Sequence, residues 1–255
     1  MDLSFTVSGQ PGPLPPVILV HGLFGQGRNL GVIARSLAET RQVVSVDLRN
    51  HGESPWDDRQ DYDAMAADLA AVIEAHGGFA DLVGHSMGGK TVMRLATTEG
   101  PLVRRAVVLD IAPVAYPHSQ NGVIDAIEAT DFSDCASRSA ADAALAQNMN
   151  DPGTRAFLLQ SLDLRAQPPR WKMNLGALRA NMDKLTGWPG GGEPFAGPAL
   201  FLHGADSDYV TDEGRAAIRS LFPQAVIEAV PGTGHWLHAE KPAEVAARVA
   251  AFLTA

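Results

Sequence analysis

Short runs of aliphatic residues, many of them β-branched, alternate along this chain with longer stretches of helical periodicity. Runs that are apolar nearly throughout are expected of strands covered on both faces, and they occur at 16–20, 42–47, 79–83, 105–109, 198–202 and 225–230. Between them, apolar residues recur three or four positions apart, as in Met65, Leu69 and Val72. The alternation predicts an α/β fold, with a mostly parallel central sheet flanked by helices.

The region 113–195 departs from this alternation. It has one helical pattern after another with no convincing strand, and it is punctuated by Pro168-Pro169 and by a glycine-rich stretch at 187–192. The region is too long for a single crossover, so we expect a helical cap inserted between two strands of the sheet. The alternative is that these helices pack on a face of the sheet. The predicted domains are therefore a core at 1–112 and 196–255 and a cap at 113–195.

Composition limits the partners and the compartment. The 255 residues carry a net charge of −9, with acids spread along the chain, so we expect neither nucleic acid nor an anionic membrane as a partner. The first residues lack a signal-peptide pattern, and the longest apolar run, about five residues, is far shorter than a membrane span. The one cysteine, Cys135, fits a reducing compartment. These features predict a cytoplasmic protein, and nothing in them indicates its oligomeric state.

The stretch Gly84-His85-Ser86-Met87-Gly88 fits the G-x-S-x-G pattern of a nucleophile elbow. It follows an apolar strand and precedes a stretch compatible with a helix. A sharp strand-to-helix turn lifts a serine hydroxyl above the sheet, and flanking glycines remove side chains that would collide in that turn. The N–H of Met87 would then lie at a helix N-terminus, where it can stabilise an oxyanion. We expect Ser86 to be a nucleophile.

The same residues support a rival interpretation. Gly84, Gly89, Lys90 and Thr91 also satisfy G-x-x-x-x-G-K-[ST], the loop that cradles phosphates in nucleotide-binding proteins. The run that ends at Asp110 resembles a strand with a magnesium-binding aspartate. Only one short helix would separate Lys90 from that aspartate, which counts against a nucleotide site.

Two glycine-rich loops supply the other groups that a serine hydrolase needs. His21-Gly22-Leu23-Phe24-Gly25 follows the first long apolar strand, where a second oxyanion donor is expected; Leu23 is the favoured N–H and Phe24 the alternative. Gly234-His235-Trp236 follows the last strand, so His235 can reach the elbow as a general base. No H-E-x-x-H motif or Cys/His cluster is present, and we expect no metal site. The motif neighbours expected to contact substrate are His21, Phe24, His85 and Trp236.

With these motifs in this order, the chain resembles the α/β-hydrolase family over nearly its whole length, and within it the small YbfF-like esterases. That closer resemblance lies in 47–55 (DLRNHGESP), 109–114 (LDIAPV) and 234–240 (GHWLHAE). It implies an α/β-hydrolase fold with an eight-strand-type sheet, a helical cap inserted after the sixth strand, no cofactor, and hydrolysis of small to medium acyl esters or thioesters.

The acid of the triad is the least determined member. Most of the family has it in a G-x-x-D turn after the penultimate strand, but here that slot holds Ser207, between Asp206 and Asp208. The resemblance to YbfF-like esterases implies an aspartate after the preceding strand instead, which matches Asp110. Asp110 is therefore favoured, with Asp206 as the alternative acid and Asp208 behind it.

The predicted function is a serine carboxylesterase for a small-molecule ester, with an acyl-enzyme on Ser86 and His235 as general base. Activity should fall at acid pH as His235 becomes protonated. A C–C bond hydrolase or a perhydrolase on the same fold is the alternative. A non-catalytic binder with an intact triad also remains open, since a fold does not determine function.

Overall fold

A mostly parallel, seven-stranded sheet forms the centre of the computed structural model, which describes residues 1–254. Its strand order is β1-β3-β2-β4-β5-β8-β9, and only β1 runs antiparallel to its neighbour. The strands are β1 (Phe5–Ser8), β2 (Val17–Val20), β3 (Val43–Val46), β4 (Ala80–His85), β5 (Val103–Leu109), β8 (Ala199–Gly204) and β9 (Ala225–Val230).

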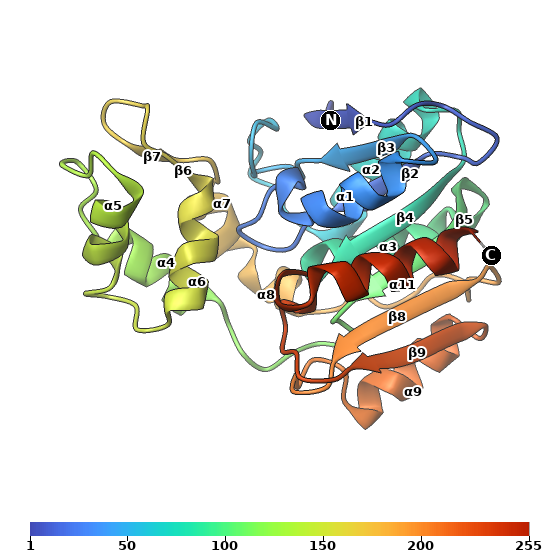
Figure 1. Cartoon of the computed structure of the whole chain (residues 1–255). Coiled ribbons are helices and arrows are strands. Elements are labelled where there is room, and N and C mark those ends of the chain that lie inside the picture. Colours follow the sequence, from blue (N-terminus) through green and yellow to red (C-terminus); the bar gives the residue numbers. More distant parts are fainter. Residues whose placement is uncertain (255) are drawn as a thin grey trace.

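Helices cover both faces of this sheet (Figure 1). Alternate residues of a strand point to opposite faces. Thus Leu19 packs with α1 (Gly31–Ala38) and α11 (Pro242–Thr254), whereas Ile18 belongs to the core that includes α2 (Tyr62–Ala75) and α3 (Met87–Thr98). Helix α9 (Asp212–Leu221) lies beside β9, and the short α10 (Leu237–Glu240) precedes α11. Burial on both faces explains why the central strands are apolar without interruption.

The sheet differs from expectation in three ways. Strand β1 was not expected, because its four residues are partly or fully exposed at the sheet edge and form too short a pattern to recognise. The resemblance implied eight strands and an insertion after the sixth. The sheet formed by residues 1–254 has seven strands, and the insertion follows β5, the fifth strand along the chain.

Residues 113–186, in the segment between β5 and β8, lie beyond the carboxyl ends of the parallel strands (Figure 1). They form α4 (Asn121–Glu128), α5 (Arg138–Leu145), α6 (Pro152–Leu158), α7 (Leu175–Ala180) and α8 (Met182–Thr186). The expectation of no strand here was wrong: β6 (Leu162–Asp163) and β7 (Arg170–Trp171) pair as a small antiparallel hairpin. Two residues a strand are too few to leave a period-2 pattern in the sequence. Within residues 1–254, every helix is too short or too polar to cross a bilayer.

Candidate active site

Ser86 lies at the sharp turn between β4 and α3. Its φ of +52° places a non-glycine residue in a left-handed conformation, which costs about 1–3 kcal/mol and persists only where the surroundings hold it. Its N–H donates to the Leu109 carbonyl of the neighbouring strand at 3.0 Å. A Cβ at Gly84 would collide with the Gly88 carbonyl, and one at Gly88 with the Val20 carbonyl. The glycines therefore let the turn close against β2 and carry the serine at its apex.

The Ser86 hydroxyl lies next to two polar side chains that come from distant parts of the sequence. His235, in the loop between β9 and α10, has its Nε2 atom 3.1 Å from Ser86 Oγ. Its Nδ1 atom lies 2.8 Å from Oδ2 of Asp110, which follows β5 and is fully buried. A buried carboxylate at Nδ1 holds the proton there, so Nε2 is free to accept the serine proton.

The structure brings Asp110, and neither Asp206 nor Asp208, to His235. Asp110 Oδ1 accepts the Gly204 N–H at 2.9 Å, and Oδ2 accepts the Ser207 hydroxyl at 2.5 Å besides the histidine. Asp206 and Asp208 are exposed. Ser207 thus occupies the slot expected for an acid and instead orients the acid from the adjacent strand. The sequence signal for this arrangement is the serine at position 207, where the G-x-x-D turn would have an acid.

Aromatic rings surround His235 on several sides. The Tyr209 ring is stacked on its imidazole, with centroids 4.0 Å apart and an interplanar angle of 18°. His85 Nε2 lies 2.9 Å from the His235 carbonyl, so that nitrogen carries the proton and donates it. The pKa of His85 lies well below its usual value, mainly because the ring is buried and secondly because the His238 and His235 rings are close to it. Burial likewise lowers the pKa of His238 to about 4. Both are therefore neutral neighbours that add no positive charge beside His235.

The loop after β2 faces the elbow and has a specific hydrogen-bond pattern. The Phe24 N–H donates to His51 Nε2 at 3.2 Å, so it is already engaged. The structure shows no acceptor among residues 1–254 for the Leu23 N–H, which lies in the cavity wall together with Met87. Met87 is the first residue of α3, where N–H groups have no partner within the helix. Leu23 and Met87 are thus better placed as oxyanion donors than Phe24.

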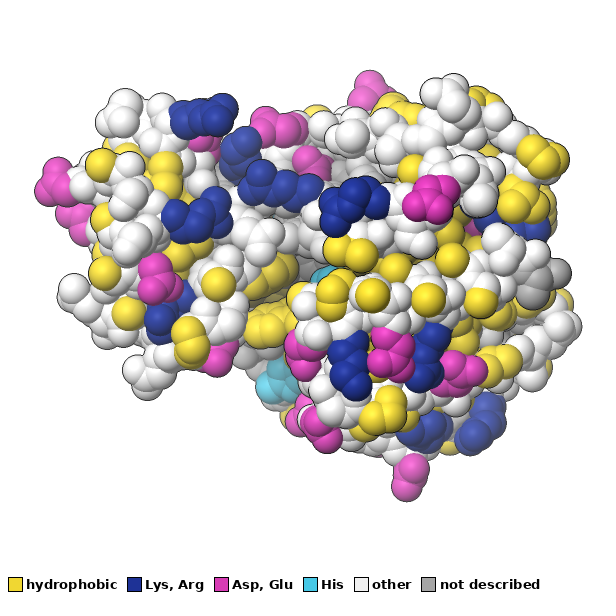
Figure 2. Space-filling model, in the orientation of Figure 1, with side chains coloured by type: hydrophobic (Ala, Val, Ile, Leu, Met, Phe, Trp, Pro, Cys, Tyr) yellow, Lys and Arg dark blue, Asp and Glu magenta, His cyan; other side chains and the backbone are white. Residues whose placement is uncertain are grey.

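A cavity of about 300 Å³ opens beside Ser86, between the sheet domain and the insertion. Figure 2 shows the hollow between these two parts, with hydrophobic and histidine side chains near it. Of the residues expected to contact substrate, Phe24, His85 and Trp236 line the cavity. His21 does not, because its ring is buried beneath the loop, where Nε2 accepts the Leu48 N–H.

The phosphate-loop interpretation of Lys90 and Thr91 is wrong. Residues from Met87 onward form a helix, so no open loop is available to cradle a phosphate. The Thr91 hydroxyl is buried and donates to the Met87 carbonyl at 2.9 Å. Lys90 Nζ donates to the carbonyls of Thr186 at 3.0 Å and Gly187 at 2.6 Å, tying the end of the insertion to α3. Among the described residues, no group of three or more His, Cys, Asp or Glu side chains is arranged to hold a metal.

Comparisons with known proteins agree with this architecture. Residues 17–248 match the family described as "Alpha/beta hydrolase family". Esterase YbfF of Escherichia coli (strain K12) is 39% identical over 243 residues, which cover 93% of this chain and 92% of the relative. The sn-1-specific diacylglycerol lipase ABHD11 of Mus musculus is 38% identical over 262 residues, 99% of this chain and 85% of the relative. A solved structure described as a marine microorganism esterase has a TM-score of 0.92 and 35% identity, and the match covers 98% of this chain and 99% of that one.

Proposed function

Since the chain belongs to the alpha/beta hydrolase family, we propose that it is a serine carboxylesterase that forms an acyl-enzyme on Ser86. The observation that carries the proposal is the continuous hydrogen-bonded series from Ser86 Oγ through His235 to Asp110. The relatives described as an esterase and a lipase favour an ester over a C–C bond as the substrate.

The reaction begins when Ser86 Oγ attacks the ester carbonyl while His235 Nε2 takes the hydroxyl proton. The buried Asp110 carboxylate stabilises the imidazolium that forms. The N–H groups of Leu23 and Met87 donate to the oxyanion of the tetrahedral intermediate. His235 returns its proton to the leaving alcohol, and the acyl group stays on Ser86.

Water completes the cycle by the same route. It loses a proton to His235, attacks the acyl carbonyl and displaces Ser86, which regains its proton as the carboxylic acid departs. The fully buried Asp110 keeps its charge throughout. The proton exchanged between Ser86 Oγ and His235 Nε2 passes between atoms that lie 3.1 Å apart in the resting structure.

The insertion at 113–195 acts as a cap in this proposal. Phe157 and Leu158 from α6, and Leu185 from α8, contribute to the cavity wall opposite the elbow. Their apolar side chains suit an acyl chain, and a cavity of about 300 Å³ suits one of small to medium length.

We further propose a cytoplasmic location, which the single, buried Cys135 supports.

The test is hydrolysis of p-nitrophenyl esters of increasing acyl length by the purified protein, with Ser86→Ala as the matched control. The wild type should turn over short to medium chains and show a burst of p-nitrophenol if deacylation is slow. Ser86→Ala should lose nearly all activity, leaving about 10³-fold acceleration over water from binding and the oxyanion hole. A Ser86→Ala protein as active as the wild type would refute the assignment.

A further inference from the structure

We propose that Ser161, a residue of the insertion, positions the oxyanion loop and so completes the oxyanion hole from outside the sheet domain. This inference rests on the proposed function. Ser161 ends the short helical turn η3 (Leu159–Ser161) and is only 2% exposed. Its hydroxyl donates to the Phe24 carbonyl at 2.9 Å, across 137 positions of sequence.

Two peptide units in series connect this hydroxyl to the proposed oxyanion donor. The peptide unit that contains the Phe24 carbonyl also contains the Gly25 N–H, which donates to the Gly22 carbonyl at 3.0 Å. The peptide unit of the Gly22 carbonyl in turn contains the Leu23 N–H. Because each peptide unit is planar, fixing its carbonyl also fixes its N–H. Hydrogen bonds in such a chain also polarise one another, which strengthens the terminal donor.

The loop needs external support because its backbone is in a costly conformation. Phe24 has a φ of +64°, a region that bulky residues rarely occupy. Such conformations persist at functional sites only where surrounding contacts hold them. His51 Nε2 accepts the Phe24 N–H at 3.2 Å, which leaves the Phe24 carbonyl to be held from the other side. Ser161 is the side chain that holds it.

His21 supports the second peptide unit from within the sheet domain. Its Nε2 accepts the Leu48 N–H at 2.9 Å, so the proton lies on Nδ1 and is donated to the Gly22 carbonyl at 2.8 Å. Burial lowers the pKa of His21 to about 4, which keeps the ring neutral and this arrangement intact. The loop is thus held by the sheet domain through His21 and His51, and by the insertion through Ser161.

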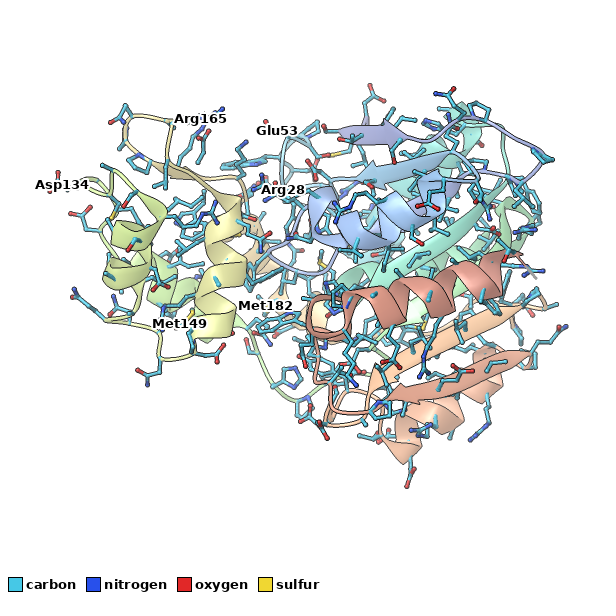
Figure 3. All side chains as sticks on the ribbon, in the orientation of Figure 1. Arg28, Glu53, Asp134, Met149, Arg165 and Met182 are labelled. Carbon is cyan, nitrogen blue, oxygen red and sulfur yellow. The ribbon has the colours of Figure 1, made fainter. Side chains whose placement is uncertain are left out.

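The Ser161 hydroxyl is itself oriented by a buried network. Gln26 Nε2 donates to Ser161 Oγ at 3.2 Å and to the Gln160 carbonyl at 2.9 Å, so the serine proton is directed to Phe24. Arg28 donates to the same Gln160 carbonyl, and Figure 3 shows it on the side of the sheet domain that faces the insertion. Asn29 Nδ2 donates to Gln160 Oε1 at 2.9 Å. The contacts that hold the insertion against the sheet domain therefore also position the oxyanion loop.

The decisive variant is Ser161→Ala, measured for kcat, KM and inhibition by a trifluoromethyl ketone, which forms a tetrahedral adduct on the serine. Removing an oxyanion donor outright costs about 10²–10³-fold in kcat. Losing only its support should lower kcat by roughly tenfold and leave KM within about twofold of wild type. The inhibition constant of the ketone should rise by the same factor as kcat falls. A role confined to pocket shape would change KM instead.

Two further variants keep the inference falsifiable. Ser139→Ala removes an exposed hydroxyl of α5 in the same insertion and should match the wild type. Gln26→Met removes the donor that orients Ser161 and should lower kcat in the same direction by about threefold, which tests the network even if Ser161→Ala folds poorly. Unchanged kcat and ketone inhibition in a folded Ser161→Ala or Gln26→Met protein would overturn the inference. An inactive wild type would instead overturn the proposed function.

Discussion

Replacing Asp110 by asparagine preserves the volume of the side chain and removes its charge. In the wild type both carboxylate oxygens accept: Oδ1 from the Gly204 N–H, and Oδ2 from Ser207 and His235. An amide has only one oxygen, and its NH₂ group cannot face the Gly204 N–H, because two donors would meet in a fully buried site. The NH₂ group must therefore take the place of Oδ2.

This orientation reverses the polarity of the histidine. An NH₂ group at the Oδ2 position donates to His235 Nδ1, which must then lose its proton to become an acceptor. The proton moves to Nε2, 3.1 Å from Ser86 Oγ, where a free lone pair is needed. The base is then in the wrong tautomer, for which a loss of about 10⁴-fold in kcat is expected. That loss corresponds to about 5 kcal/mol of transition-state stabilisation.

The assay is kcat/KM on a p-nitrophenyl ester for Asp110→Asn beside Asp206→Asn. Asp206 occupies the alternative position, is exposed, and offers the same chemical change without a contact to His235. Asp206→Asn should stay within about twofold of wild type, since exposed substitutions away from such contacts have small effects. Circular dichroism and thermal unfolding would show that Asp110→Asn is folded. A folded Asp110→Asn with near-normal activity, or an inactive Asp206→Asn, would refute the assignment of the acid.

Two further predictions concern stability. Burial lowers the pKa of Lys90 from 10.5 to about 7, so above pH 7 the unfolded chain retains a proton that the folded chain has lost. Between pH 7 and pH 10, the unfolding free energy of the wild type should therefore rise by about 3 kcal/mol relative to that of Lys90→Met. Urea titrations at each pH measure both free energies, and a difference between the two proteins that does not change with pH would contradict this. In Gly88→Ala, the added methyl group would collide with the backbone carbonyls of Val20 and His21 at the end of β2. The substitution should lower the unfolding free energy by about 1–3 kcal/mol. Gly122→Ala, in α4 with open space around it, should instead stabilise by up to about 1 kcal/mol, and equal effects of the two would refute the steric argument.

The buried strands and the elbow could be predicted from the sequence because their signals are local. An apolar run such as Val17–Val20 reports burial on both faces, and Gly84 and Gly88 report a turn that tolerates no side chains. The exposed edge strand Phe5–Ser8 carried no comparable signal, and neither did the two-residue strands of the insertion. Short elements are stabilised by their neighbours rather than by their own pattern.

The same distinction between local sequence signals and long-range contacts applies to the active site. The sequence alone determined where a strained serine and a loop histidine occur, since glycine spacing and chain order reflect steric requirements within a few residues. Tertiary structure decided which aspartate reaches His235, which N–H of the loop after β2 stays free, and that Lys90 joins α3 to the insertion rather than to a phosphate. These outcomes depend on hydrogen bonds between segments far apart in the chain. Donor and acceptor geometry across such distances exists only once the sheet has brought the segments together.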